Sequence, residues 1–279
     1  MKSSIIYFFY FSIIFFCMCA FGQNNDLQEK ERSTISLGVS IGINDFHQLD
    51  KYLSPLIFNG INFASKISFQ AKTKDNRHRI DGFFTIGTLN PDIQQREVTL
   101  KGGYISYSFV HSLHSWELAG HQLQLSIGPG ISSYVMNTDF NTTDETGYIT
   151  LDQSWYWSHS FNLIFLGNYI FDKNKNISLQ FTIPFAELVS RPENGHRLSQ
   201  TNLDVVDKNF LNASKQGKLE YLWNNFVFFT DLEYHQSINN NFELGLGYRF
   251  GWVSSDKPAS ILFTSMYMNQ LFAGIDYLF

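Results

Sequence analysis

The chain has 279 residues, a formal net charge of −5 and only two cysteines. The acidic balance argues against a nucleic-acid partner, because binding to phosphate backbones favours a basic surface. Both cysteines, Cys17 and Cys19, lie near the N-terminus, so the rest of the chain offers no disulfide framework, thiolate nucleophile or cysteine metal site.

The N-terminal segment predicts export from the cytoplasm. Lys2 precedes an apolar run from Ile5 to Cys19, and Ala20-Phe21-Gly22 then gives a small-x-small cleavage pattern. The run of about 15 residues is shorter than the roughly 20 that a membrane-spanning helix needs. We therefore expect residues 1–22 to be a cleaved signal peptide and the polar residues 23–33 to be a short periplasmic segment.

From Thr34 onward, apolar and polar residues alternate in segment after segment. In Thr34–Ile43, every second residue from Ile35 to Ile43 is aliphatic, and the residues between them are serine or glycine. This period of two predicts a strand with one apolar face. Nine further segments show the pattern: 61–72, 79–89, 103–113, 122–136, 155–171, 177–185, 223–235, 242–253 and 262–279. In the 122–136 segment, Gly128-Pro129-Gly130 predicts a bend or bulge.

The connections between these segments alternate in character. Short polar turns at Thr73–His78, Asp172–Asn176 and Gln236–Asn241 contain the Asn, Asp and Lys typical of tight turns. Longer or more variable connections separate them, and Glu187–Leu222 is the longest. Short turns on the periplasmic side and longer loops outside are typical of transmembrane β-barrels.

These patterns predict an all-β fold, a transmembrane antiparallel up-and-down β-barrel that spans residues 34–279. Ten strands fit best, and eight or twelve are the alternative counts. The segment 187–222 is then a long extracellular loop, either a lid, a partner-binding segment or a mobile connection. A mean hydropathy of −0.15 with 17% aromatic residues agrees with a barrel, whose strands are apolar on one face only. A secreted β-sandwich is the soluble alternative.

The last segment carries a resemblance to a known class of proteins. Counting back from the C-terminus in steps of two gives an apolar, aromatic face of Phe279, Tyr277, Ile275, Ala273 and Leu271. This ending resembles the C-terminal insertion strand of Gram-negative outer-membrane β-barrel proteins. The resemblance implies an integral outer-membrane location, contact with outer-membrane lipid and lipopolysaccharide, and insertion by the barrel-assembly machinery. The insertion signal would comprise Leu271, Ile275, Tyr277 and Phe279.

Aromatic residues are expected at both membrane interfaces, where one side of the ring is apolar and the other is wet. The predicted strands place four tryptophans at their outer ends: Trp155, Trp157, Trp223 and Trp252. Tyr234, Phe242, Tyr277 and Phe279 fall at the inner ends. The sequence therefore predicts two aromatic girdles.

The inward faces predict a filled lumen. Six bulky residues point inward, Phe83, Tyr104, Phe229, Met266, Met268 and Phe272, and argue against a wide aqueous pore. Charged residues of both signs gather toward the periplasmic half: Lys66, Arg79, Asp81, Asp231, Glu233, His235, Glu243, Arg249 and Asp276. Because buried charges need partners, we expect a salt-bridged plug. A catalytic or proton-coupled site built from Asp231, Glu233 and His235 is the alternative.

Two sites at the outer rim resemble known membrane hydrolases. Asp45 and His47 have the spacing of an Asp–His pair on one strand face, as in the ten-stranded omptin proteases, although the rest of the omptin pattern is absent. His159 and Ser160 are similar to the residue types of outer-membrane phospholipases, but adjacent strand residues point to opposite faces. We assign no catalytic residue from either pair.

The histidines His111, His114 and His121 surround one periplasmic turn, and their H-x-x-H spacing is that of some metal sites. Solvated turn histidines are the simpler interpretation, so no metal or cofactor is assigned. The sequence as a whole predicts a non-enzymatic outer-membrane barrel, a structural or surface-exposed binding component that works alone or within a larger outer-membrane complex. The alternatives are a narrow transport barrel for a small or hydrophobic solute and a rim hydrolase acting on lipid or peptide.

Overall fold

The computed structural model describes residues 34–50, 57–91, 98–143, 149–190, 218–221, 225–255 and 264–279. The expected signal peptide and the segment 23–33 lie outside these ranges. The strands are β1 Thr34–Asp50, β2 Ile57–Lys72, β3 Asn76–Pro91, β4 Val98–Leu118, β5 His121–Thr143, β6 Ile149–Asp172, β7 Lys175–Ser190, β8 Lys218–Tyr221, β9 Asn225–Ser237, β10 Phe242–Ser255 and β11 Thr264–Leu278. Among the described residues, no helix is long and apolar enough to cross a membrane.

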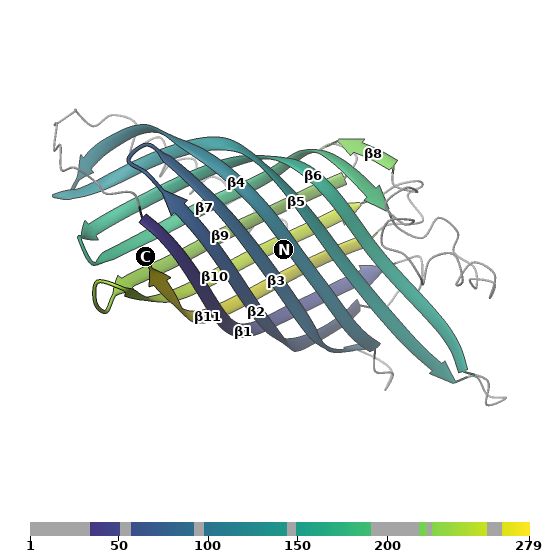
Figure 1. Cartoon of the computed structure of the whole chain (residues 1–279). Helices are drawn as coiled ribbons and strands as arrows, with labels where there is room; N and C mark the ends of the chain where they lie inside the picture. The colour runs from purple at the N-terminus through teal and green to yellow at the C-terminus, as the bar shows by residue number, and fades with distance from the viewer. Residues whose placement is uncertain are drawn as a thin grey trace.

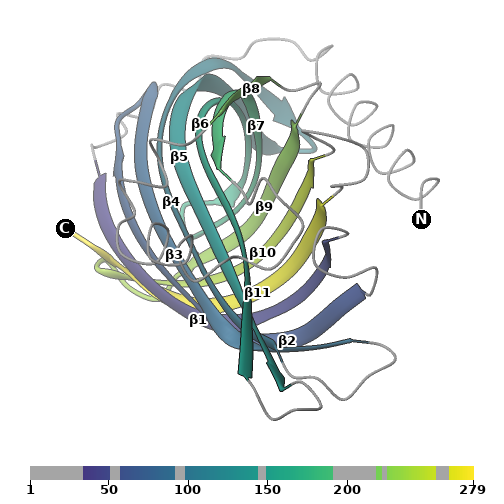
Figure 2. The same ribbon diagram turned by 90° about the vertical axis from the view of Figure 1, so that its right-hand side faces the viewer.

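The strands form one antiparallel sheet that closes on itself (Figures 1 and 2). Its order is β6-β5-β4-β3-β2-β1-β11-β10-β9-β7-β8, and the pairing of β6 with β7 completes the ring. Ten long strands make the wall. The short β8 pairs with the outer part of β7, at Ala186–Val189, where β9 no longer pairs with it. The predicted ten-stranded up-and-down barrel is therefore confirmed, and the β-sandwich alternative is wrong.

The first and last strands meet at one seam. β1 and β11 pair from Ser36 opposite Leu278 to Asp50 opposite Thr264. The backbone N–H of Phe279 donates to the carbonyl oxygen of Ile35 at 3.0 Å. Because every long strand then has a neighbour on both sides, the wall has no free edge along this seam.

The two ends of the barrel differ. Short connections join β2 to β3, β4 to β5, β6 to β7 and β9 to β10, and they lie at the end where β1 begins and β11 finishes. We call this the inner end and the opposite one the outer end. Ala119 and Gly120 connect β4 to β5 with φ of 54° and 80°, the left-handed conformation that two-residue hairpin turns require.

Some strands are much longer than a bilayer requires. β5 has 23 residues and β6 has 24, whereas about 9–11 tilted residues cross the hydrocarbon layer. The pairing of β5 with β6 continues to Thr143 opposite Ile149. In Figure 1 this hairpin reaches farther to the right than the other strands. The barrel therefore carries a projecting hairpin at its outer end.

The two faces of the wall have opposite chemistry. In β1, Val39, Ile41 and Ile43 are at least half exposed on the outside, whereas Asn44 and Phe46, on the opposite face, are fully buried in the lumen. The same exposed aliphatic and aromatic belt runs round β2, β3, β10 and β11, and its most exposed member is Ile61. A bilayer solvates such a surface and water does not.

Two local predictions need correction. The sheet runs through Gly128-Pro129-Gly130 in regular register, and the irregularity of the β4–β5 pair falls instead between Ser112 and His114. Gly128 is required by close packing, since a Cβ there would lie 1.9 Å from the carbonyl oxygen of Phe109. At the expected loop 187–222, the residues up to Ser190 continue β7, and β8 occupies 218–221.

Candidate functional site: the filled lumen

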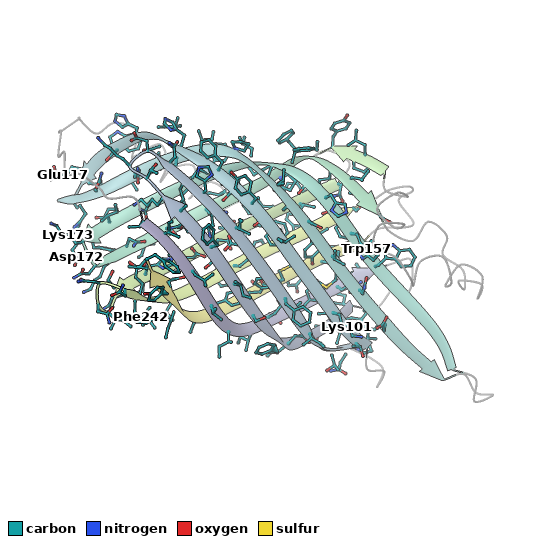
Figure 3. All side chains as sticks on the ribbon, viewed as in Figure 1. Lys101, Glu117, Trp157, Asp172, Lys173 and Phe242 are labelled. Carbon is teal, nitrogen blue, oxygen red and sulfur yellow. The ribbon has the colours of Figure 1, made fainter. Side chains whose placement is uncertain are left out.

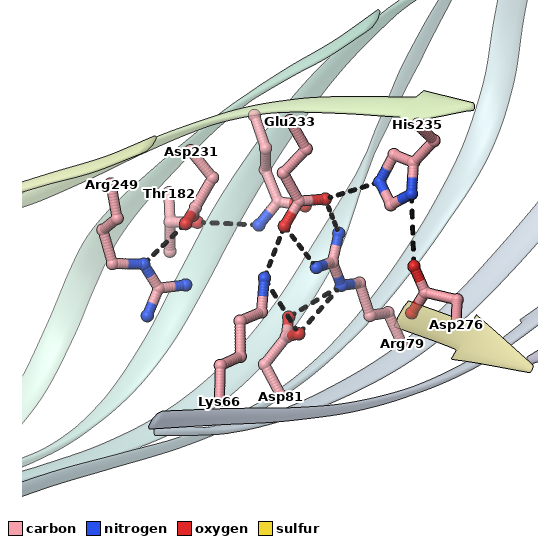
Figure 4. A network of polar contacts seen from close by, with 10 residues as sticks. Lys66, Arg79, Asp81, Thr182, Asp231, Glu233, His235, Arg249 and Asp276 are labelled. Atoms are coloured by element: carbon pink, nitrogen blue, oxygen red, sulfur yellow. Dashed lines mark hydrogen bonds and ion pairs between the residues drawn. The ribbon is translucent and has the colours of Figure 1, made fainter. Parts of the chain in front are cut away.

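An ion-pair network crosses the inner half of the lumen (Figure 4). The guanidinium of Arg79 in β3 donates to both carboxylate oxygens of Glu233 in β9 at 2.6 Å each. It also pairs with Asp81 at 2.8 Å. Lys66 of β2 pairs with Glu233 and lies 3.7 Å from Asp81. Since β3 and β9 stand on opposite sides of the ring, these contacts tie one wall to the other.

A third basic residue connects this network to a layer of aromatic rings. Arg249 in β10 donates to its cross-strand neighbour Asp231 at 2.5 Å. Its guanidinium carbon also lies 5.3 Å from the ring centre of Phe83 and 4.8 Å from that of Tyr104. All these side chains are buried. A cation over aromatic faces is favourable where water is excluded, so Arg249 joins the charged and aromatic parts.

The aromatic layer fills the middle of the barrel. Phe83 and Phe272 make an edge-to-face contact at 5.0 Å, and Tyr104 packs against Phe229 at 5.2 Å. Met268 is buried in the same apolar cluster. Edge-to-face and tilted rings at these distances are the preferred aromatic arrangements. The lumen is thus packed like a protein interior at this level.

Polar contacts continue toward the outer end. Thr138 of β5 donates to Gln48 of β1 at 2.9 Å, and both side chains are buried. Asn225 of β9 donates to Glu187 of β7 at 2.9 Å and to the hydroxyl of Tyr156 in β6 at 2.7 Å. The outer part of the lumen is therefore also crossed by hydrogen bonds between strands that are not neighbours in the chain.

A separate cluster lies nearest the inner mouth. His235 of β9 places Nδ1 3.3 Å from Asp276 of β11 and Nε2 3.5 Å from Glu233. Glu243 of β10 accepts a hydrogen bond from Ser237 at 2.9 Å. The donor atoms of His235, Glu243 and Asp276 all lie within 4.8 Å of one another. These three side chains combine an imidazole and two carboxylates on three adjacent strands.

The structure therefore brings the nine charged residues expected in the lumen to its inner half. The contacts arrange them in two parts that the sequence did not distinguish, joined by the 3.5 Å contact between His235 and Glu233. One part pairs Lys66, Arg79 and Arg249 with Asp81, Asp231 and Glu233; the other is His235, Glu243 and Asp276. Glu187 was not expected inside at all, because it follows the last strongly alternating residue of its segment.

The two rim pairs differ in geometry. Asp45 and His47 are in contact at 3.0 Å, and His47 stacks on Tyr267 with ring centres 4.2 Å apart. Both lie on the same face of β1 as Ile41 and Ile43, outside the barrel. Ser160 faces the lumen and bonds to Ser132 at 2.7 Å, while His159 occupies the opposite face.

The turn histidines are held separately. His111 contacts Asn76 at 2.9 Å, and His121 contacts the carbonyl oxygen of Phe171 at 2.8 Å. His114 packs on Trp116 with ring centres 4.4 Å apart. Within the described ranges these three histidines do not converge on one point, so the H-x-x-H spacing does not build a metal site there.

The aromatic residues expected at the interfaces lie toward the two ends. Figure 3 shows Phe242 near the inner end and Trp157 near the outer end. Tyr277 makes edge-to-face contacts with Phe242 and with Phe279, with ring centres 5.3 Å and 4.8 Å apart. At the outer end, Trp252 packs on Phe226, whereas Trp155 and Trp157 are 9% and 7% exposed beside Val135. Trp223 lies outside the described residues.

Comparison with one solved structure supports the assignment of the fold. The outer-membrane protease OmpT of Escherichia coli aligns with a TM-score of 0.51 at 12% identity, over 88% of this chain and 97% of that one. The Neisserial surface protein A, NspA, aligns with a TM-score of 0.36 at 10% identity, over 89% and 100% of the two chains. Ail of Yersinia pestis gives 0.34 at 8% identity, over 88% and 98%.

No family model matches the chain, and no curated protein matches it. At 12% identity the likeness to OmpT concerns the fold and not the activity. The chain thus has the fold of the small Gram-negative outer-membrane β-barrel proteins, with ten wall strands and one short extra strand.

Proposed function

We propose that this protein is a non-conducting outer-membrane barrel, a structural or surface-exposed binding component that works through its outer rim. The observation that carries the proposal is the continuous packing of the lumen. Ion pairs join opposite walls at the inner half, aromatic rings fill the middle, and hydrogen bonds cross the outer half. A lumen filled in this way leaves no path for a hydrated solute.

The outer rim is the part of the molecule that remains for contacts. The β5–β6 hairpin projects from the barrel, and β8 adds a short strand along β7 at the same end. Outer-membrane barrels commonly carry their specific functions on extracellular segments. A partner protein in a larger outer-membrane complex would bind this rim, while lipid and lipopolysaccharide would surround the exposed apolar belt.

The location is part of the proposal. An exposed apolar belt, a closed wall and an aromatic C-terminal strand together suit insertion in an outer membrane by the barrel-assembly machinery. Density-gradient separation of membranes from the native organism tests this. We expect the protein in the outer-membrane fraction, and recovery with the inner membrane or in the soluble fraction would contradict it.

The closed lumen is tested by planar-bilayer recording of the purified, folded protein. We expect no discrete channel openings above the bare-bilayer baseline, with insertion verified by protease protection in vesicles prepared from the same sample. Stepwise conductance in the verified sample would overturn the proposal in favour of transport.

The binding role is tested by gentle extraction of native membranes and isolation of the tagged barrel. A variant in which the tip residues 144–148 are replaced by Gly and Ser serves as the matched control, because the change leaves the wall intact. We expect a stoichiometric partner with the native chain and less of it with the variant. If the native protein and the variant are both isolated without a partner, the result would contradict a role in a complex.

A further inference from the structure

We propose that His235, Glu243 and Asp276 form a binding site for a divalent transition-metal cation at the inner mouth of the barrel. The site goes beyond the proposed binding role of the outer rim, since it lies at the opposite end of the lumen. An imidazole with two carboxylates is a ligand set suited to first-row divalent metals, and water would complete the coordination.

The first argument is electrostatic. Glu243 and Asp276 are directly opposite each other in the β10–β11 pair, and like charges at directly opposite positions destabilise a sheet. In the described part of the chain, neither carboxylate forms an ion pair with a lysine or arginine. Arg77, the nearest inward residue of β3 to this end, pairs with neither. A bound cation would convert this repulsion into attraction.

The neighbouring network does not supply the missing charge. Three basic side chains, Lys66, Arg79 and Arg249, already face three acidic ones, Asp81, Asp231 and Glu233. Arg77 adds a further positive charge beside this network, but it forms no ion pair with Glu243 or Asp276 in the described part of the chain. The two carboxylates therefore face each other across the β10–β11 pair with His235 as the ion-pair partner of Asp276.

The second argument is the orientation of the imidazole. Metal-binding histidines usually donate the second ring N–H to a carboxylate, which fixes the tautomer and directs the free nitrogen at the metal. Glu233 lies 3.5 Å from Nε2 of His235 and is itself held by Arg79 and Lys66 (Figure 4). This arrangement leaves Nδ1 directed at Asp276. Ser237 orients Glu243 in the same manner through its hydrogen bond.

The third argument is space. Gly245 stands directly opposite His235, and a Cβ there would lie 3.4 Å from Asp276 Oδ2 and 3.8 Å from His235 Nδ1. Because residue 245 is glycine, no side chain occupies this position beside the cluster. His235 and Asp276 retain 21% and 15% side-chain exposure, so an ion can enter from the inner mouth.

The distances require only a small adjustment. Metal–ligand bonds of about 2.0–2.2 Å place neighbouring donor atoms roughly 3–3.5 Å apart. The pair His235 Nδ1 and Asp276 Oδ2, at 3.3 Å, already meets this spacing. Rotation of the Glu243 side chain closes the remaining separation, which is at most 4.8 Å.

Calorimetric titration of the folded, chelator-treated barrel in detergent with Zn²⁺ alone tests the site. We expect one saturable ion per chain, at least tenfold tighter than Ca²⁺, because calcium takes oxygen ligands and gains nothing from the imidazole. Bound Zn²⁺ should also raise the unfolding temperature, by mass action on the folded state. Zn²⁺ binding that is absent, or no tighter than Ca²⁺ binding, overturns the proposal.

Variants identify the ligands. Glu243→Gln keeps an oxygen for Ser237 and should lower Zn²⁺ affinity at least tenfold, as should Asp276→Asn and His235→Gln. The matched controls, His111→Gln and Glu117→Gln, change exposed residues at the same end and should leave the affinity unchanged. Retained heat-resistant mobility shows that each variant is folded. Affinity that survives in folded Glu243→Gln and Asp276→Asn, or that is lost in His111→Gln, overturns the assignment.

Discussion

Arg79 and Glu233 meet from opposite sides of the barrel, and the guanidinium donates to both carboxylate oxygens at 2.6 Å. Their separation in the chain is 154 residues. We therefore expect the pair to act as a strut that holds the lumen at a fixed width and stabilises the wall.

Replacing Arg79 with methionine should destabilise the barrel by about 3–5 kcal/mol, because Glu233 would remain buried without the guanidinium that pairs with both of its oxygens. Urea unfolding in detergent, followed by tryptophan fluorescence, measures the change. Lys101→Met is the matched control. Its ion pair with Asp139 is exposed and 3.9 Å long, so less than about 1 kcal/mol is expected. Equal midpoints for both variants would refute the role of the strut.

The double variant Arg79→Met, Glu233→Met should recover part of the stability that the single variant loses. Removal of both ions leaves no unpaired charge, and apolar side chains of similar volume often replace a buried pair at little cost. A double-mutant cycle compares the wild type, Arg79→Met, Glu233→Met and the double variant. It gives the coupling energy between Arg79 and Glu233. Additive effects of the two single changes would show that the residues do not act together.

Arg249→Met should also be strongly destabilising, by about 3–5 kcal/mol, since Asp231 would lose its partner at 2.5 Å. The aromatic layer would lose the cation over Phe83 and Tyr104 as well. Thermal unfolding monitored by the shift in gel mobility measures the effect. A wild-type transition temperature would mean that Arg249 contributes nothing to the plug.

Gly274→Ala should prevent proper closure between β1 and β11. A Cβ at this position would lie 2.4 Å from the carbonyl oxygen of Val39, which belongs to the backbone and cannot rotate away. We expect a several-fold lower yield of heat-resistant barrel on refolding into detergent. Gly82→Ala is the control, because its nearest neighbour is 3.9 Å away. Similar yields from the two variants would be inconsistent with this packing.

Deletion of Phe279 should reduce the amount of assembled barrel in the membrane. The deletion removes the N–H that bonds to Ile35 and the ring that packs on Tyr277 at 4.8 Å. Quantification of the heat-resistant species in membrane fractions measures this. Phe171→Ala, which removes another exposed aromatic ring at the inner end, should have a smaller effect. An unchanged amount of heat-resistant barrel in the deletion variant would contradict a role of Phe279 in insertion.

The strand pattern was predictable because lipid and lumen impose opposite chemistry on alternate residues. This contrast is strong in Thr34–Ile43 and in the last strand, and both were located from sequence. It fades beyond the bilayer, where both faces are polar or aromatic. The outer extensions of β5, β6 and β7 were therefore missed, and the four residues of β8 are too few to show a period.

Contacts across the lumen were not predictable in the same way. The inward direction of Arg79 and Glu233 follows from alternation, but their meeting depends on the tilt and register of the whole ring. The same limit applies to Glu243 and Asp276, which are 33 positions apart in sequence and directly opposite in the sheet. The nearness of His235 and Glu243 could have been predicted, because the short turn between Ser237 and Glu243 fixes the register of the hairpin that carries both residues.

The pairing of β1 with β11 also has a consequence for the order of assembly. The two strands at the seam are the first and the last of the wall. The hydrogen bonds between them therefore join residues that are farther apart in sequence than those of any other strand pair in the wall. Until the final strand arrives, β1 presents an unpaired edge that can recruit another chain. Non-local pairings of this kind are slow to form. We therefore expect assembly to require a partner protein that covers the β1 edge until β11 pairs with it.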